Sequence, residues 1–308
     1  MTTTAGTLVR TGTGEAPAHH GELLQGVFDD GGDCRPGLLT LPWHRVGATA
    51  TFRPTAIGQG VSVVVNPPHK TRARLATEQL LTHLRAAHGA PAVSGVLHLR
   101  GRLPVGVGMG SSSADVLAAM RAAMDAVGAT VEDADLCRFG AAAEGACDPL
   151  AHLPRAVLFA QRQGRVIEEF GAALPPMVVL SCETGAGRPV ETEGCAAPDH
   201  AYLPDYERLR ARVRSALATA DPAALGAVAT ESAELNQERL PKVELGHLKA
   251  ACLRHGGVGV QVAHSGNVAG VLFAGGSAGI LPGVRRCAAQ LERAGVRVHG
   301  WYDVPTGR

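Results

Sequence analysis

The sequence predicts an α+β fold divided into two domains, and three observations support this prediction. A chain of 308 residues with 45% hydrophobic content can bury a substantial core and has the length of two domains. Its first half alternates strand-like and helix-like stretches around a glycine-rich loop. Its second half reads β-α-β-β-α-β with added helices, the order of a split βαβ domain. We therefore expect domains over 1–173 and 174–308, with the boundary in the proline-containing segment 171–176.

Hydrophobic periodicity places the elements of the first half. Alternating or β-branched residues predict strands, and apolar residues three to four positions apart predict helices. A pair resembling a capping box, Thr130 and Asp133, indicates a helix start, and Pro149 prevents easy continuation of that helix. The expected strands are 45–53, 61–66, 93–103, 155–161 and 165–170, the last two forming a hairpin, and the expected helices are 76–88, 112–127 and 130–144.

The second half is read in the same way. Its strands are short and rich in valine, and its helices are amphipathic. The expected strands are 177–181, 258–262, 268–273 and 296–302, and the expected helices lie within 206–218, 222–239, 245–255 and 283–294.

Composition argues against several classes of partner. The formal charge is +1 with no basic stripe, so no nucleic-acid partner is expected. The N-terminal residues lack a charged segment followed by an apolar one, so we expect no secretory signal, and no run of about 18 apolar residues predicts a membrane span. Seven widely spaced cysteines without a C-x-x-C pair are typical of reduced thiols, and we interpret Cys147 as a small buried thiol. We expect a cytoplasmic protein, either a monomer or a homodimer.

The most informative segment is 104–115, which reads PVGVGMGSSSAD between a predicted strand and a predicted helix. Small residues let successive backbone N–H groups point at one anion, and the helix N-terminus adds its own N–H groups. The segment is not a P-loop, because G-x-x-x-x-G-K-[ST] is missing and none of the three lysines lies near it in the sequence. Glycines also make ordinary turns before helices, so the segment alone is weak evidence.

Three ordered segments together resemble the GHMP small-molecule kinases. Segment 104–114 is similar to their signature P-x-G-x-G-L-G-S-S-A, with Met109 in place of leucine and Ser113 in place of alanine. Segment 16–26 lies where that superfamily has its N-terminal signature, and 262–273 resembles its third signature. The core G-E-L-L-Q-G of the first segment is similar to G-E-L-I-Q-G of the L-threonine kinases, in which roughly P-A-S-C replaces the P-A-H-H found here.

The resemblance implies a fold, two cofactors and a set of site residues. The N-terminal domain would bind ATP and be ribosomal protein S5 domain 2-like, and the C-terminal domain would be a ferredoxin-like split βαβ unit. ATP would be bound with Mg²⁺. The residues expected to hold the nucleotide phosphates are Pro104, Gly106, Gly108, Met109, Gly110, Ser111, Ser112 and Ser113.

The chemistry of phosphoryl transfer assigns further roles. Mg²⁺ needs only one or two protein oxygens, and the resemblance implies Ser112 and Glu144 as its ligands. The alternatives are a plain helix N-cap for Ser112 and a solvated helix charge for Glu144. The resemblance also implies a role for Asp148, which lies where several members of that superfamily have an aspartate that contacts the reacting hydroxyl. It is either a base or a positioning group, since an alcohol's pKa lies far above that of a carboxyl.

The residues that contact the substrate are expected in the first segment, 16–26, and the third segment, 262–273. Adjacent histidines point in different directions and lack zinc-ligand spacing, so a hydrogen bond to substrate or plain packing is favoured over a metal site. A loop arginine, Arg188, could bind an acceptor carboxylate. The expected substrate-binding residues are His19, His20, Gly21, Glu22, His264, Ser265 and Gly266.

These inferences predict an ATP-dependent kinase whose acceptor is a small hydroxylated amino acid. The resemblance names L-threonine as the first candidate, with O-phospho-L-threonine as its product. Two alternatives remain open. One is a kinase of a different small alcohol, and the other is a catalytically silent nucleotide-binding member of the fold.

Overall fold

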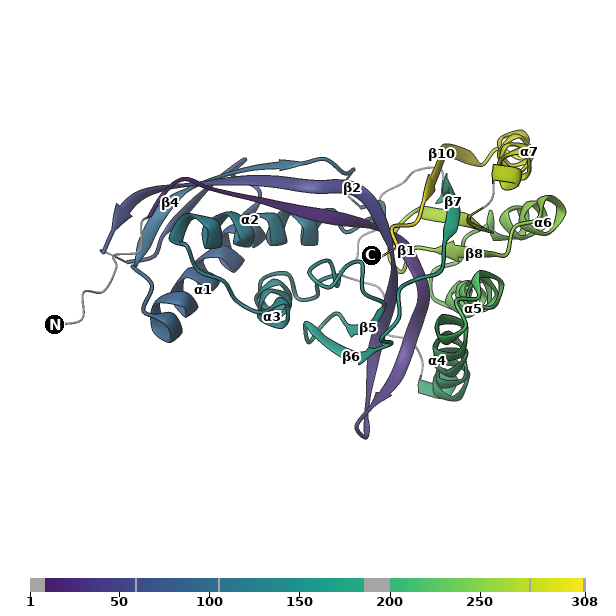
Figure 1. Cartoon of the computed structure of the whole chain (residues 1–308), viewed down its shortest axis with the longest axis horizontal. Helices are drawn as coiled ribbons and strands as arrows, with labels where there is room; N and C mark the ends of the chain where they lie inside the picture. Colours follow the sequence, from purple (N-terminus) through teal and green to yellow (C-terminus); the bar gives the residue numbers. More distant parts are fainter. Residues whose placement is uncertain (1–8, 59, 105, 186–199, 277, 307–308) are drawn as a thin grey trace.

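The computed structural model describes residues 9–58, 60–104, 106–185, 200–276 and 278–306 of the chain. Two long strands, β1 (Gly12–Asp30) and β2 (Asp33–Ile57), form an antiparallel hairpin that runs through most of the molecule (Figure 1). Helices α1 to α3 lie along one end of this hairpin, and helices α4 to α7 lie at the other. The hairpin therefore connects the two halves of the chain.

The first half forms a sheet covered by helices on one face. The strands β3 (Val63–Asn66) and β4 (Val93–Gly101) extend the sheet from β2 in the order β2-β4-β3. A hairpin of β5 (Val157–Ala160) and β6 (Arg165–Glu169) pairs with β2 at one position, and this confirms the predicted hairpin. The helices are α1 (Thr71–His88), α2 (Ser111–Val127) and α3 (Asp133–Glu144).

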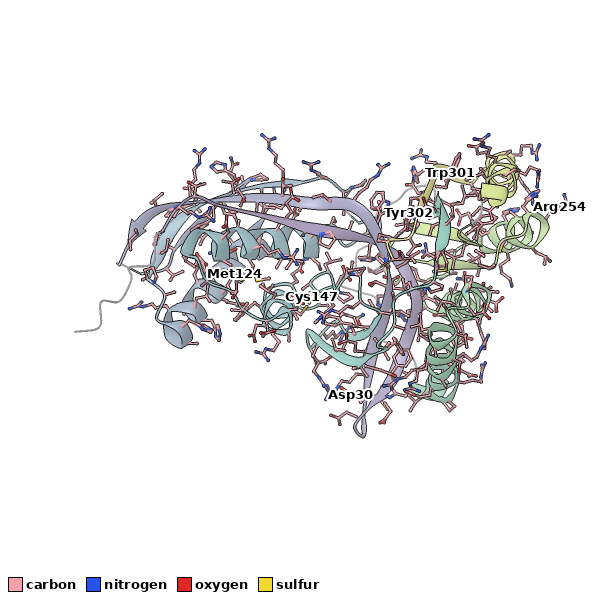
Figure 2. All side chains as sticks on the ribbon, in the orientation of Figure 1. Asp30, Met124, Cys147, Arg254, Trp301 and Tyr302 are labelled. Carbon is pink, nitrogen blue, oxygen red and sulfur yellow. The ribbon has the colours of Figure 1, made fainter. Side chains whose placement is uncertain are left out.

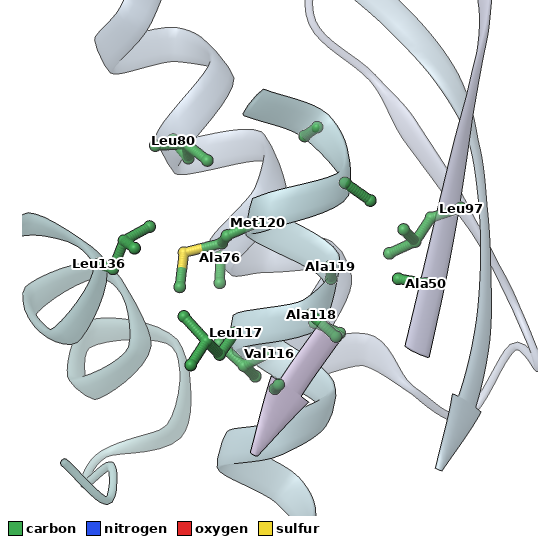
Figure 3. Close-up of a cluster of buried hydrophobic side chains, with 14 of the residues drawn as sticks. Ala50, Ala76, Leu80, Leu97, Val116, Leu117, Ala118, Ala119, Met120 and Leu136 are labelled. Carbon is green, nitrogen blue, oxygen red and sulfur yellow. The ribbon is translucent and has the colours of Figure 1, made fainter. Parts of the chain in front are cut away.

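Helix α2 is the centre of the first hydrophobic core. Its side chains meet α1 and α3 on one side, where Met120 and Leu117 face Leu136, and the strands on the other (Figure 3). Its alanines allow close packing against β1, where a Cβ on Gly14 would lie 2.3 Å from the carbonyl oxygen of Ala118. This close packing holds the middle of α2 against β1.

The second half confirms the predicted split βαβ order. Its strands are β7 (Met177–Glu183), β8 (Gly259–Val262), β9 (Val268–Ala274) and β10 (Arg297–Asp303), and they are antiparallel in the order β10-β7-β9-β8. The helices are α4 (Leu203–Ala218), α5 (Pro222–Leu235), α6 (Leu245–His255) and α7 (Leu281–Arg293). Short 3₁₀ turns are η3 (His200–Tyr202), η4 (Asn236–Glu238) and η5 (Ala278–Ile280).

One bridge between Glu22 and Val262 joins β1 to β8, so the ten strands found in the described residues form a single sheet. The division of the chain at residue 173 stays a prediction. Side chains cover both ends of the hairpin (Figure 2), with Asp30 at its tip in ion pairs with Arg35 and Arg165.

Several predicted details are wrong. No strand is predicted over 12–30, because β1 is buried on both faces from position 18 to 28 and shows no alternation there. The expected strand 45–53 is only part of the 25-residue strand β2. No capping box forms at α3, where Glu132 is the N-cap residue and makes no side-chain capping bond. The helix expected over 222–239 ends as an α-helix at Leu235.

The described residues bear on the expectations about reduced cysteines and about a membrane-spanning helix. The six cysteines in the described ranges are free thiols, and Cys147 is buried, as predicted; Cys195 lies outside those ranges. Within the described part of the chain, no helix has the length and apolar character needed to cross a bilayer.

Candidate active site

The glycine loop adopts a backbone that only glycine allows at two crowded positions. Gly106, Gly108 and Gly110 all have positive φ, at 79°, 83° and 72°. A Cβ on Gly108 would lie 2.5 Å from the Ala263 Cβ, and one on Gly110 would lie 2.6 Å from the His19 ring. The loop leads directly into the first turn of α2, whose N–H groups form an anion-binding end. This arrangement fits the phosphates of a nucleotide.

The third segment supports this loop from the C-terminal half. The carbonyl oxygen of Val107 accepts hydrogen bonds from the N–H groups of Asn267 and Val268, both at 2.9 Å. Gly266 packs so tightly that a Cβ there would lie 2.3 Å from the Gly108 Cα. The buried ammonium of Lys242 donates to the Gly266 carbonyl at 2.6 Å. The loop is therefore held between the two halves of the sequence.

Lysines lie closer to this region in space than the sequence suggested. Besides Lys242, the Lys70 ammonium forms an ion pair with the buried carboxylate of Asp115 in α2. Their distance from the loop in sequence hid this proximity, because each comes from a different element of the fold. Two lysines therefore lie near the loop, Lys70 in an ion pair with Asp115 and Lys242 bonded to the Gly266 carbonyl.

The two oxygen groups expected to hold Mg²⁺ lie side by side. The Ser112 hydroxyl donates to one oxygen of Glu144, and the Ser113 hydroxyl donates to the other at 3.0 Å. Burial raises the pKa of Glu144 to about 7, although the two serine hydroxyls act in the opposite direction. Glu144 is thus not a solvated helix charge, and Ser112 is not the N-cap, which is Gly110. A hydroxyl and a carboxylate in contact are the hard oxygen donors that Mg²⁺ prefers.

Asp148 lies at the junction of the loop, α2 and β1. Its N–H donates to the Ser113 hydroxyl at 3.1 Å, and its carboxylate oxygen Oδ2 lies 3.3 Å from Nε2 of His19. This contact lies off the line of a hydrogen bond, so the attraction is chiefly between charges. Burial alone would raise the pKa of Asp148, but His19 and then His264 outweigh it and lower the pKa below its ordinary value. The carboxylate is therefore ionised at neutral pH.

His19 and Glu22 continue this cluster along β1. The His19 ring is 2% exposed, and its Nδ1 lies 3.9 Å from Oε1 of Glu22. Burial favours a neutral ring, but Asp148 and Glu22 outweigh it and raise the pKa of His19. Burial raises the pKa of Glu22 to about 7. The other oxygen of Glu22 accepts from the N–H of His264, which links the first and third segments.

His20 points to the opposite side of β1, into the C-terminal sheet. Its Nε2 lies 2.8 Å from the Ser181 hydroxyl, and its Nδ1 lies 2.7 Å from the side-chain nitrogen of Gln261. Its ring packs against Tyr302 with centroids 5.5 Å apart. Burial lowers the pKa of His20 to about 3, so the ring is neutral. The neighbouring Gly21 also faces Gln261, which would meet a Cβ there at 2.3 Å.

The structure thus brings together most of the residues singled out from the sequence, but not all. His20 and Gly21 face away from the cluster of His19, Asp148 and Gly110. Arg188 lies outside the described residues. Sequence reasoning missed Lys242, because no motif marks a residue that reaches the loop from another part of the fold. Asn267 lies in the third segment, 262–273, but it was not among the site residues expected there.

Part of the chain matches the model of a known protein family. Residues 74–152 match the family model described as GHMP kinases N terminal domain. This segment includes the glycine loop, Ser112, Glu144 and Asp148. No curated protein matches the sequence.

Solved structures extend the likeness to the whole chain. A homoserine kinase from Cytophaga hutchinsonii is 13% identical with a TM-score of 0.66, covering 99% of this chain and 97% of that one. A phosphomevalonate kinase from Streptococcus pneumoniae is 13% identical with a TM-score of 0.65, covering 96% and 100%. The Lin0012 protein from Listeria innocua is 14% identical with a TM-score of 0.70, covering 97% and 99%. The chain has the α+β fold of the GHMP kinases, and residues 74–152 carry the sequence pattern of their N-terminal domain.

Proposed function

We propose that this protein is an ATP-dependent kinase that phosphorylates the hydroxyl group of a small amino acid, with L-threonine as the first candidate. The observation that carries the proposal is the convergence of the glycine loop, the Ser112–Glu144 pair and the Asp148 carboxylate at the N-terminus of α2. Phosphoryl transfer requires these three parts: an anion cradle, oxygen ligands for a divalent ion and a group facing the reacting alcohol.

The donor site follows from the loop. Backbone N–H groups of Gly106 to Ser113 would hold the phosphates of ATP, since the loop leaves no room for side chains at Gly108 and Gly110. Ser112 and Glu144 would hold Mg²⁺, completed by phosphate oxygens and water. When bound, Mg²⁺ neutralises the charge of the transferring phosphoryl group.

The transfer step requires one new bond and one broken bond. The acceptor oxygen bonds to the γ-phosphorus while the bond from that phosphorus to the bridging oxygen of ADP breaks. The proton of the alcohol passes to the ionised Asp148 carboxylate and from there to solvent. Because the pKa of Asp148 is lowered, its main contribution is to orient the hydroxyl and receive the proton late in the step.

The proposed acceptor side contains a buried carboxyl group and a buried ammonium group. Glu22 lies on β1 with the Lys242 ammonium acting on it from the C-terminal half. An amino acid carries an ammonium and a carboxylate, so a zwitterion is complementary to such a pair. The G-E-L-L-Q-G segment around Glu22 and the fold shared with a protein named homoserine kinase also support a hydroxylated amino acid.

The test is ATP consumption with a panel of acceptors. Purified protein is assayed with ATP and Mg²⁺ against L-threonine, L-serine, L-homoserine and unrelated alcohols, with EDTA as the control. We expect turnover to be fastest with L-threonine and to be lost in EDTA. Faster turnover of another alcohol would replace L-threonine as the substrate. ATP binding without turnover of any acceptor would contradict the kinase function and favour a silent nucleotide-binding protein.

A further inference from the structure

We propose that Cys137 and Cys147 are an oxidation site, which forms a disulfide with hydrogen peroxide and thereby displaces the residues that follow α3. Cys137 lies within α3, and Cys147 lies in the segment after this helix, between Glu144 and Asp148. The inference goes beyond the proposed function, because the bond can form whether or not the protein is a kinase.

The two cysteines meet on one face of α3. The Cys147 thiol donates to the Cys137 carbonyl at 3.2 Å. It also covers Gly140, one turn further along the helix, where a Cβ would lie 3.6 Å from the Cys147 Sγ. Both side chains line a cavity of about 10 Å³, roughly the space of one water molecule, and they are 4% and 5% exposed. The pair is therefore close together and closed to large reagents.

The surroundings of Cys137 favour its thiolate, which is the reactive form of a cysteine. Arg155 donates to Nδ1 of His152 at 2.9 Å, which leaves the proton of a neutral imidazole ring on Nε2. That N–H is a donor for a thiolate, and His152 acts on Cys137. A hydrogen bond from the Cys147 thiol, together with His152, outweighs burial and lowers the pKa of Cys137 below its ordinary value.

The buried cysteines of the C-terminal half have the opposite environment. Cys182, Cys252 and Cys287 lie among the apolar side chains of the third core cluster. Burial raises the pKa of Cys252 to about 11 and that of Cys287 to about 12, and it raises the pKa of Cys182 as well. These three thiols therefore stay protonated and serve as an internal comparison for Cys137.

The oxidation balances with one molecule of peroxide. The Cys137 thiolate attacks one peroxide oxygen, the O–O bond breaks, and the departing hydroxide takes up the proton that the thiol released. The Cys147 sulfur then attacks the sulfur of the resulting sulfenic acid, and its proton leaves with the hydroxyl group as a second water. The two sulfurs lose two electrons in total, and the peroxide becomes two waters.

The new bond would disturb the contacts of both proposed catalytic groups. It removes the S–H that donates to the Cys137 carbonyl, and its length of about 2.05 Å draws Cys147 toward the other sulfur. The adjacent N–H of Asp148 donates to the Ser113 hydroxyl at 3.1 Å, and that hydroxyl donates to Glu144 at 3.0 Å. A shift of Cys147 therefore loosens the hydrogen bonds that place Asp148 and Glu144.

The experiment treats the full chain with hydrogen peroxide and maps its disulfides by mass spectrometry. Cys147→Ala and Cys147→Ser each remove the second thiol. Cys287→Ala is the matched control, because it removes a buried thiol from the other half. Dimedone, which reacts with sulfenic acids, traps the intermediate, and oxidised glutathione serves as a bulky oxidant for comparison.

We expect peroxide to produce the Cys137–Cys147 disulfide in wild type and in Cys287→Ala, and dithiothreitol to reverse it. Both variants at position 147 should instead carry dimedone on Cys137. Oxidised glutathione should form no mixed disulfide with either cysteine, because both are buried.

Activity gives a second readout if the protein is the proposed kinase. The disulfide should lower kcat by about tenfold or more, since a displacement of about 1 Å is enough for such a loss. Dithiothreitol should restore kcat, whereas oxidation of Met109 to its sulfoxide would persist in this reagent. Recovery therefore assigns the loss to the disulfide.

Three results would overturn the inference. The first is the absence of a Cys137–Cys147 disulfide in folded wild type under conditions that oxidise the partly exposed Cys34. The second is the absence of dimedone on Cys137 in both variants at position 147. The third is an unchanged kcat in an active protein that carries the disulfide. Mass spectrometry detects the bond without turnover, so a lack of turnover in the reduced protein would count against the proposed function alone.

Discussion

His19 and His20 are neighbours in β1, and they belong to different regions of the molecule. Both rings are nearly inaccessible, at 2% and 1% exposure. His19 faces the glycine loop and two carboxylates, while His20 faces a serine, a glutamine and aromatic rings of the C-terminal sheet. Burial favours the neutral form of both, yet the pKa of His19 is raised and that of His20 falls to about 3. The charge of the neighbours decides the direction in which the pKa of each histidine moves.

We propose that the His19 side of β1 serves the chemistry and that the His20 side serves stability. Substitutions on the His19 side should change turnover more than folding, and those on the His20 side should do the reverse. The predictions below test this separation in order of expected effect.

The largest effect is expected for Asp148→Asn. The amide keeps the shape of the side chain but loses the charge that faces His19 and that, in the proposed mechanism, faces the acceptor. We expect kcat to fall by at least about tenfold while ATP affinity, measured by calorimetry, stays nearly the same. Asp205→Asn on the surface of α4 is the control. Turnover of Asp148→Asn at the wild-type rate would remove Asp148 from the mechanism.

A smaller effect is expected for Gly110→Ala, which changes the donor loop itself. The residue has φ of 72°, and the new Cβ would contact the His19 ring. The left-handed backbone costs an alanine about 1–2 kcal/mol, and the clash adds to it, so ATP should bind about tenfold more weakly or worse. Gly31→Ala is the matched control. Gly31 has a similar φ of 70°, but a Cβ there would have no atom within 4 Å, so this variant adds backbone strain without a clash. Equal ATP affinity in both variants would contradict the crowding argument.

His20→Asn should affect stability and leave the chemistry intact. Loss of the contacts to Ser181 and Gln261 should lower the free energy of unfolding by about 1–3 kcal/mol, measured in urea. At a temperature where the variant is folded, its kcat should equal that of wild type. A large loss of kcat in the folded variant would break the separation between the two sides of β1.

The pH dependence of stability sharpens the same comparison. The folded-state pKa of His20 is about 3 and its ordinary value is 6.5, so its contribution is complete above pH 6.5 and is lost as pH falls toward 3. This loss approaches about 1.4 kcal/mol per pH unit. The pKa of His264 is lowered to about 4, so its contribution to stability is also lost as pH falls. The pKa of Glu22 is raised to about 7, so its contribution instead grows as pH falls. The free energy of unfolding, measured in urea, should therefore fall more steeply with decreasing pH in wild type than in His20→Asn. Equal dependence on pH in the two proteins would contradict a neutral buried His20.

The smallest effect is expected for Cys147→Ala. This thiol lies between Glu144 and Asp148 in sequence, but its Sγ donates to the Cys137 carbonyl at 3.2 Å inside the core. Removing that bond should cost about 1 kcal/mol and leave turnover unchanged. A loss of turnover beyond the stability effect would indicate that Cys147 takes part in the chemistry.

Local patterns predicted the loop, the helices around it and the β-α-β-β-α-β order of the second half. Gly106, Gly108 and Gly110 need positive φ, and helix periodicity is visible from one segment alone. The resemblance also named Ser112 and Glu144, and they are in contact. Their roles, like that of Asp148, remain predictions.

The remaining features depend on contacts that one segment cannot reveal. Strand β1 was missed because burial on both faces removes the alternation that marks a strand. For the same reason the sequence did not distinguish His19 from His20, which differ only in the side of β1 that each one faces. Lys242 reaches Gly266 from a turn after α5, and no pattern in its own segment indicates that contact.

The strand that carries both histidines also limits how this protein can diverge. A substitution changes one histidine and leaves the other in place. An inserted or deleted residue in β1 ahead of His19 would instead turn the following side chains to opposite sides, exchanging the positions of the two rings. Related sequences should therefore change residue type at positions 19 and 20 more readily than they change the spacing from Gly14 to His19.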